Sequence, residues 1–124
     1  MFALYDIIQT IKSPVKTIGI GAICSAAVLL LACGEKREAT ENSWLMAHNA
    51  TTDCEGNILK VRAQFEAFKR YEKLRYDLLA KHTNLTAAQW KKRENSEGEV
   101  WLDSKQMLEA GIIDKILINK PVVK

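Results

Sequence analysis

The sequence predicts a single α/β domain in which short buried strands alternate with helices. Short apolar or β-branched runs, at about 15–21, 44–48 and 112–123, are separated by longer stretches whose apolar residues recur at helical spacing. This alternation favours helices packed on sheets. The 124 residues suit one domain at most, and 48% hydrophobic with 27% charged residues is a globular balance.

The first half of the chain predicts a helix, a strand and a second helix. Residues 2–12 carry isoleucine and leucine at helical spacing until Ser13-Pro14 stops the helix. Residues 15–21 are β-branched and predict a buried strand that ends at a glycine-permitted turn. Residues 25–33 predict a buried helix with Gly34 as its C-cap.

The second half begins with a polar connection, 35–42, and a short strand, 44–48. A polar loop, 49–57, then leads into a long amphipathic helix over 58–82, in which apolar residues recur three, four or six positions apart. A shorter helix is predicted after Thr86 as N-cap, another from Ser104 to Gly111, and a final strand over 112–123.

Charge and cysteine usage exclude several function classes. The net charge is only +3, and Lys and Arg are interleaved with Glu and Asp between Lys60 and Lys81, so a nucleic-acid interface is not expected. Cys24, Cys33 and Cys54 are odd in number and lack metal-ligand spacing, so neither a disulfide framework nor a metal site is predicted. Free thiols favour a reducing, cytoplasmic location.

The apolar run from Ile18 to Cys33 has a rival interpretation as a secretory segment. Leu30-Leu-Ala-Cys-Gly34 resembles a bacterial lipobox, which would lipidate Cys33. The run is shorter than the roughly 20 residues of a membrane span, so no membrane association is predicted. Asp6 upstream and the glycines and serine within the run argue against a secretory signal.

Ser25 and His48 are the candidates for hydrolytic chemistry. Ser25 lies where a predicted strand turns into a helix, a position that exposes a nucleophile and points the next backbone N–H at a developing oxyanion. His48 ends the next predicted strand and is one of two histidines. An N-cap serine and an ordinary strand-end histidine would give the same local pattern, and sequence spacing alone does not join the two residues.

The order of the segments resembles the ClpP family of ATP-dependent proteases over nearly the whole chain. Gly21-Ala-Ile-Cys-Ser25-Ala-Ala-Val-Leu-Leu-Leu-Ala-Cys-Gly34 is similar to the family's nucleophile segment, and Asn42-Ser-Trp-Leu-Met-Ala-His48 to the segment that ends in its general base. Shorter similarities are Ala3-Leu-Tyr-Asp6, Leu79-Ala-Lys-His-Thr83 and Gly111-Ile-Ile-Asp-Lys115.

The resemblance implies a ClpP/crotonase-like spiral fold, truncated at its N-terminus, with Ser25 as nucleophile and His48 as base. Counting back from Gly111 implies Glu99 as the triad acid, in place of an aspartate, with Glu97 and Asp103 as fallbacks. In the family, one oxyanion donor is the backbone N–H after the nucleophile, here that of Ala26.

Departures from the family pattern fall around this site. Ala26-Ala27 stands where the family has Met-Gly, and the upstream Gly-Gly loop that supplies the second oxyanion donor has no counterpart, because Met1 aligns inside the family domain. The resemblance divides residues 1–124 into a head, about 1–48 and 83–124, and a handle, about 49–82. Asn49 and Gly56 in the handle are expected to contact the substrate strand or the opposite ring.

The implied function is a cytoplasmic serine endopeptidase subunit of paired heptameric rings. It would cut unfolded polypeptides fed by a Clp-type AAA+ ATPase, with ATP used by that partner and no cofactor in this subunit. An inactive ring subunit, a phage prohead protease of the same fold and, more remotely, the lipoprotein remain alternatives.

Overall fold

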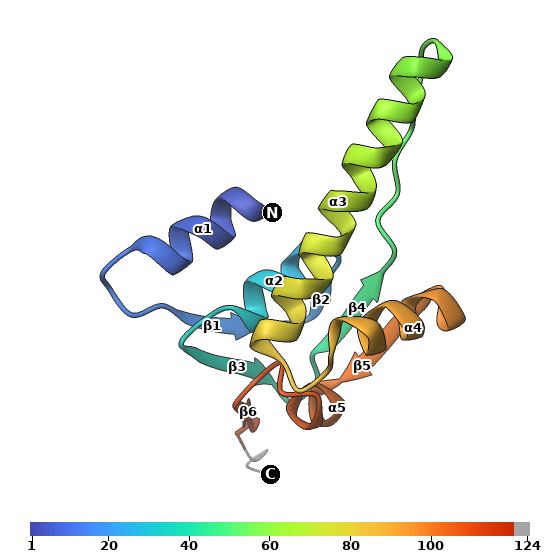
Figure 1. The fold of residues 1–124 in the computed structure, drawn as a ribbon. Helices are drawn as coiled ribbons and strands as arrows, with labels where there is room; N and C mark the ends of the chain where they lie inside the picture. Colours follow the sequence, from blue (N-terminus) through green and yellow to red (C-terminus); the bar gives the residue numbers. More distant parts are fainter. Residues whose placement is uncertain (121–124) are drawn as a thin grey trace.

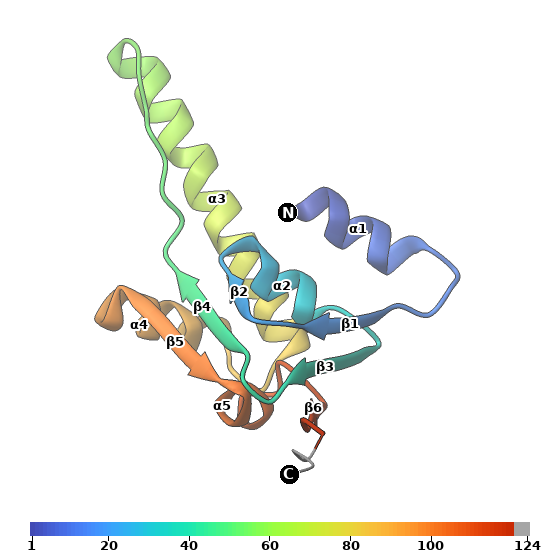
Figure 2. The same ribbon diagram turned by 180° about the vertical axis from the view of Figure 1, so that it is seen from behind.

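The computed structural model describes residues 1–120 and has a mixed α/β architecture (Figures 1 and 2). Its helices and strands follow in the order α1 (Phe2–Thr10), β1 (Lys16–Gly19), β2 (Ala22–Cys24), α2 (Ala26–Ala32), β3 (Lys36–Thr40), β4 (Trp44–His48), α3 (Ile58–His82), α4 (Ala87–Glu97), β5 (Glu99–Asp103), α5 (Ser104–Glu109) and β6 (Lys115–Leu117).

Two three-stranded sheets form the framework. One has the order β1-β3-β6 and is parallel throughout. The other has the order β2-β4-β5, with β2 parallel and β5 antiparallel to β4 (Figure 2). The carboxyl ends of β2 and β4 therefore lie at the same edge of one sheet, where α/β proteins commonly place their reactive groups.

Strands β3 and β5 were not predicted from the sequence. The predicted polar connection, 35–42, is wrong, because β3 occupies Lys36–Thr40. Only Ala39 of this strand is buried, and Glu38 pairs with Lys16, so the apolar signal of a strand is missing. Strand β5 has Val100 and Leu102 buried between exposed neighbours, a pattern too short to have been distinguished.

Two predicted strands have different bounds in the structure. The run 15–21 ends early at β1 because Gly21, at φ 68°, turns the chain into the separate strand β2. The final strand is much shorter than 112–123: only Lys115–Leu117 is extended in a sheet, and 121–123 lies outside the described residues. Ile112 and Ile113 are instead buried in the core.

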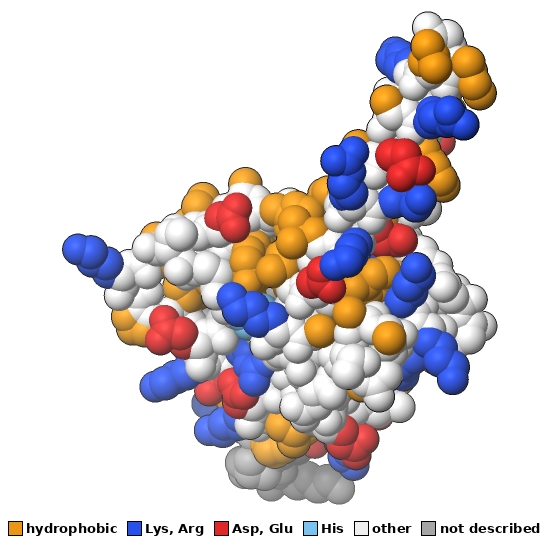
Figure 3. All heavy atoms as spheres, in the orientation of Figure 1, with side chains coloured by type: hydrophobic (Ala, Val, Ile, Leu, Met, Phe, Trp, Pro, Cys, Tyr) orange, Lys and Arg blue, Asp and Glu red, His pale blue; other side chains and the backbone are white. Residues whose placement is uncertain are grey.

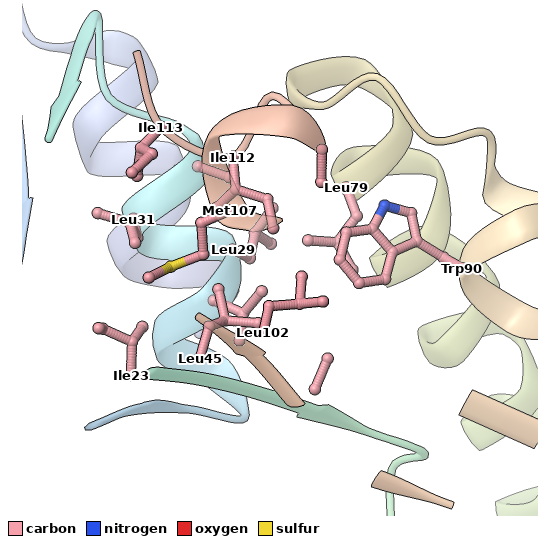
Figure 4. Close-up of a cluster of buried hydrophobic side chains, with 14 of the residues drawn as sticks. Ile23, Leu29, Leu31, Leu45, Leu79, Trp90, Leu102, Met107, Ile112 and Ile113 are labelled. Carbon is pink, nitrogen blue, oxygen red and sulfur yellow. The ribbon is translucent and has the colours of Figure 1, made fainter. Parts of the chain in front are cut away.

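The core lies between the sheets and helices α2, α3, α4 and α5 (Figure 4). Its largest fully buried side chain is Trp90, whose indole N–H donates to Thr83 Oγ1 at 3.0 Å. The other labelled members in Figure 4 are aliphatic: Ile23, Leu29, Leu31, Leu45, Leu79, Leu102, Met107, Ile112 and Ile113. Packing in the core thus holds helix α2 in place, and with it Ser25, the residue at its N-cap.

The end of α2 differs from expectation. The C-cap is Cys33, in a helical conformation, and not Gly34. Gly34 is needed for space: a Cβ there would lie 2.5 Å from Thr17 Oγ1, which donates to the carbonyl of Leu31 at 2.7 Å. Glycine therefore lets α2 pack closely on β1.

The predicted long helix is confirmed as α3, 25 residues that begin at Ile58 and end at His82. Its N-terminal half extends away from the rest of the chain, with the segment after β4 running beside it (Figure 1). Charges of both signs cover its exposed side (Figure 3), and Lys73 pairs with Asp77 one turn away. Exposed Ile58 and Leu59 lie near its tip.

Arg37 joins β3 to the ends of two helices. Its guanidinium donates to the carbonyl of His82 at 2.5 Å and to that of Gly111 at 2.7 Å, and it pairs with the carboxylate of Asp114. Hydrogen bonding from Arg37 lowers the pKa of Asp114. His82 itself is half-buried, and its Nε2 lies 2.9 Å from the hydroxyl of Tyr5 in α1.

Protonation of His82 is expected to destabilise the fold. Burial, followed by the charges of Lys81 and Arg37, lowers the pKa of His82 below its usual 6.5. The unfolded chain therefore binds this proton more readily, and stability falls as the pH drops through that range. Urea unfolding between about pH 7.5 and 5 should show a smaller decline for His82→Gln than for the wild type. Equal declines would show that His82 is not the titrating group.

Candidate active site

Ser25 sits at a strained turn between β2 and α2. It is the one non-glycine residue of 1–120 with positive φ, at φ 57° and ψ −119°. Such a conformation costs about 1–3 kcal/mol and persists only where neighbouring structure imposes it. Here the Ser25 N–H donates to the carbonyl of Met46 at 2.8 Å, while α2 is held by the core.

The side chain of Ser25 does not cap α2. Ser25 occupies the N-cap position, yet its hydroxyl makes no capping hydrogen bond. The interpretation of Ser25 as a simple N-cap serine is therefore wrong. A strained strand-to-helix turn with an exposed hydroxyl that does not cap the helix is the geometry of a hydrolase nucleophile.

His48 lies within hydrogen-bond distance of Ser25. The parallel register pairs Cys24 with Met46, so Ser25 follows β2 beside the last residues of β4. His48 Nε2 is 3.0 Å from Ser25 Oγ. On the other side of the ring, Nδ1 is 2.7 Å from the backbone carbonyl of Asn49.

These contacts define the tautomer of His48. A carbonyl oxygen only accepts hydrogen bonds, so Nδ1 carries the ring proton and donates a hydrogen bond to the backbone carbonyl of Asn49. Nε2 then presents a lone pair to the hydroxyl of Ser25. This is the protonation state that a general base requires.

Glu99 lies directly opposite His48. Antiparallel pairing of β4 with β5 sets the two residues side by side on the same face of the sheet. The carboxylate of Glu99, however, accepts from the indole N–H of Trp101 at 3.0 Å, and no hydrogen bond joins it to His48 within residues 1–120. Its role as triad acid stays a prediction.

The two fallback carboxylates are engaged elsewhere. Asp103 caps α5 by accepting from the backbone N–H of Gln106 at 2.8 Å. Glu97 pairs with Arg93 along α4. Of the three acidic candidates, only Glu99 therefore faces the base.

Ala26 begins α2, so its backbone N–H has no acceptor within the helix. The N–H of Ser25 is already committed to Met46. The donor after the nucleophile is therefore the one left for an oxyanion. Over the described 120 residues, no three His, Cys, Asp or Glu side chains are grouped to hold a metal ion.

The cysteines lie outside this arrangement. Cys33 is 3% exposed in the core, and burial raises the pKa of its thiol. Cys24 directly precedes Ser25 and is half-buried. No helix within residues 1–120 has the length and apolar composition to cross a bilayer.

A buried polar cluster behind Asn49 was missed from the sequence. Glu94, fully buried, accepts two hydrogen bonds from the guanidinium of Arg75 and lies 2.9 Å from the hydroxyl of Tyr76. The helical spacing of these residues could have indicated their burial. Arg75 lies four residues before buried Leu79, and Glu94 lies four residues after buried Trp90, so both charged residues share the buried face of their helix. Gly56, predicted as a contact residue, lies just before α3 at φ 130°.

Strain at Ser25 predicts an unusual order of variant stabilities. Glycine adopts positive φ without a Cβ clash, whereas alanine keeps the strain. Ser25→Gly should therefore unfold with a free energy about 1 kcal/mol higher than Ser25→Ala, although glycine normally destabilises by increasing unfolded-state entropy. Chemical denaturation of both variants measures the difference. A more stable alanine variant would contradict the strained backbone.

The chain is similar in sequence to known proteins of one family. The family model described as Clp protease matches residues 1–120. ATP-dependent Clp protease proteolytic subunit 2 of Treponema denticola is 33% identical over 122 residues, which are 96% of this chain and 60% of that relative. Subunit 3 of Frankia casuarinae is 30% identical over 124 residues, which are 98% of this chain and 57% of that relative. The chain thus spans a little over half the length of these relatives, and it belongs to the Clp protease family.

Proposed function

We propose that this chain is a serine endopeptidase subunit of a Clp-type ATP-dependent protease, with the ClpP/crotonase-like spiral fold of that family. The observation that carries the proposal is the 3.0 Å contact between Ser25 Oγ and His48 Nε2 at a strained strand-to-helix turn. Family membership supports the peptidase class, and both relatives are named as proteolytic subunits.

The proposed reaction uses groups whose positions have been described. His48 Nε2 takes the proton of Ser25 as its oxygen attacks the peptide carbonyl, and the Ala26 N–H donates to the oxyanion. His48 then protonates the leaving amine, and water releases the acyl group from Ser25 by the reverse transfers. Glu99, opposite His48, supplies negative charge that stabilises the imidazolium.

The proposed setting is a chamber of stacked rings. We propose heptameric rings paired through α3 and the residues before it, including Asn49 and Gly56, with exposed Ile58 and Leu59 near the contact between rings. A Clp-type AAA+ ATPase would hydrolyse ATP and feed unfolded polypeptide to Ser25. The proposed location is the cytoplasm.

A second candidate is a ring subunit without activity. The bond between Trp101 and Glu99 favours it, because this carboxylate is engaged away from His48. The retained Ser25–His48 contact favours the enzyme.

A fluorophosphonate probe distinguishes the two candidates. It should label the full-length wild-type protein, and labelling should vanish in Ser25→Ala, because the probe bonds to an activated serine oxygen. His48→Gln should label about 10²–10⁴ times more slowly, since the base is lost. Mass spectrometry of the labelled peptide and the time course of labelling provide the readouts. Absence of labelling in an assembled wild-type protein would support the inactive subunit.

The contribution of Glu99 is expected to be modest. If Glu99 acts only through its charge near His48, Glu99→Gln should lower kcat for an unstructured peptide by about tenfold, equivalent to about 1.4 kcal/mol. Loss of a carboxylate that directly holds the imidazole costs about 10⁴-fold. A loss of that larger size would show that Glu99 bonds to His48 during turnover.

A further inference from the structure

The orienting partner of His48 is a backbone carbonyl in a segment without regular structure. His48 Nδ1 donates to the carbonyl of Asn49 at 2.7 Å, one residue beyond the end of β4. The segment from Asn49 to Gly56 belongs to no helix or strand. A peptide in such a segment keeps one orientation only if something else fixes it.

The side chain of Asn49 is held from two helices. Its amide lies 2.9 Å from the hydroxyl of Tyr76 in α3 and 3.1 Å from the side-chain amide of Asn95 in α4. These contacts restrict the rotation of residue 49 and therefore the direction of its carbonyl. Asn95 is exposed, whereas Tyr76 is 4% exposed, so Tyr76 is the firmer of the two anchors.

Tyr76 is fixed in turn by a buried ion pair. Its hydroxyl lies 2.9 Å from Glu94 Oε2, and Glu94 is held by both terminal nitrogens of Arg75. The guanidinium carbon of Arg75 also lies 4.4 Å from the centroid of the Tyr76 ring. Burial, followed by the hydrogen bond to Glu94 and its charge, raises the pKa of Tyr76, so the phenol remains protonated.

The single proton of the Tyr76 hydroxyl determines how Tyr76 is bonded to Asn49 and Glu94. The phenol has one proton but lies 2.9 Å from both Glu94 Oε2 and Asn49 Oδ1. The anionic carboxylate is the stronger acceptor. With the proton on the Glu94 side, the side-chain amides of Asn49 and Asn95 would both be rotated by half a turn. Asn49 would then donate its N–H to the phenol oxygen and accept an N–H from Asn95.

We propose that Tyr76 is a positioning residue for the general base. It holds Asn49 so that the Asn49 carbonyl keeps His48 in the Nδ1–H tautomer, with Nε2 free to accept the proton of Ser25. Arg75 and Glu94 fix Tyr76. The inference rests on the proposed peptidase function for its consequence in catalysis, but the tautomer itself does not depend on activity.

Tyr76→Phe tests the proposal, with Tyr5→Phe as a matched control. Each variant removes one buried phenol hydroxyl near a histidine: Tyr5 bonds to His82, and Tyr76 acts on His48 through Asn49. The side-chain ¹⁵N spectra of the two histidines report each tautomer in the full-length protein, and fluorophosphonate labelling reports the reactivity of Ser25.

In Tyr76→Phe we expect His48 to change from the Nδ1–H tautomer to a mixture of both tautomers. Labelling of Ser25 should slow about three- to tenfold, the effect of one hydrogen bond. Tyr5→Phe should alter only the His82 signals and leave labelling unchanged. Asn49→Ala, which keeps the backbone carbonyl, should reproduce the Tyr76→Phe effects, and the double variant should label no more slowly than either single variant.

Three outcomes would overturn the inference: an unchanged His48 tautomer in both Tyr76→Phe and Asn49→Ala, equal slowing in Tyr5→Phe, or additive losses in the double variant. If Tyr76→Phe does not fold, Asn49→Ala decides by the same readouts. If the wild type is not labelled at all, the proposed peptidase function fails, and the His48 spectra still decide the positioning role.

Discussion

Parallel pairing of β2 with β4 is the constraint on which the site depends. The register that sets Cys24 beside Met46 places Ser25 next to the end of β4, and the Ser25 N–H bonds to the Met46 carbonyl. A shift of the β2–β4 register by one residue would turn the side chains of the shifted strand to the other face of the sheet. The pairing thus brings together two residues that lie 23 positions apart in the chain.

The rest of the fold holds this pairing in place. On the buried face of the sheet, Leu45 and Leu102 are sealed under α2 and α5, so the outer face can carry His48 and Glu99. The energy that keeps Ser25 in its strained conformation comes from apolar burial along α2, to which a fully buried leucine contributes about 1.5–3 kcal/mol. A strain of about 1–3 kcal/mol is therefore within the reach of this core.

The sequence predicted the helices better than it predicted the sheets. Helix α3 carries a long apolar period, and Thr86, the predicted N-cap of α4, accepts the backbone N–H of Gln89. Strand β3 was missed because its polar side chains are paired in space with partners distant in sequence. Such partners leave no periodic signal.

Contacts between residues distant in sequence also limit how much of the site could be predicted. The predicted strand-to-helix turn indicated Ser25 as a candidate nucleophile. Its contact with His48 depends on the β2–β4 register, which the sequence does not give. The carbonyl of Asn49 could not have been predicted at all, because every residue has one. Its anchor, Tyr76, looks like an ordinary helix aromatic until Glu94 and Arg75 are placed around it.

A crystal structure of the full-length protein after reaction with diisopropyl fluorophosphate tests the central claim most directly. The account predicts a phosphorus bonded to Ser25 Oγ, a phosphoryl oxygen accepting from the Ala26 N–H, and His48 still bonded to the Asn49 carbonyl. An adduct on another residue, or a Ser25 adduct with His48 turned away and φ of Ser25 negative, would contradict it.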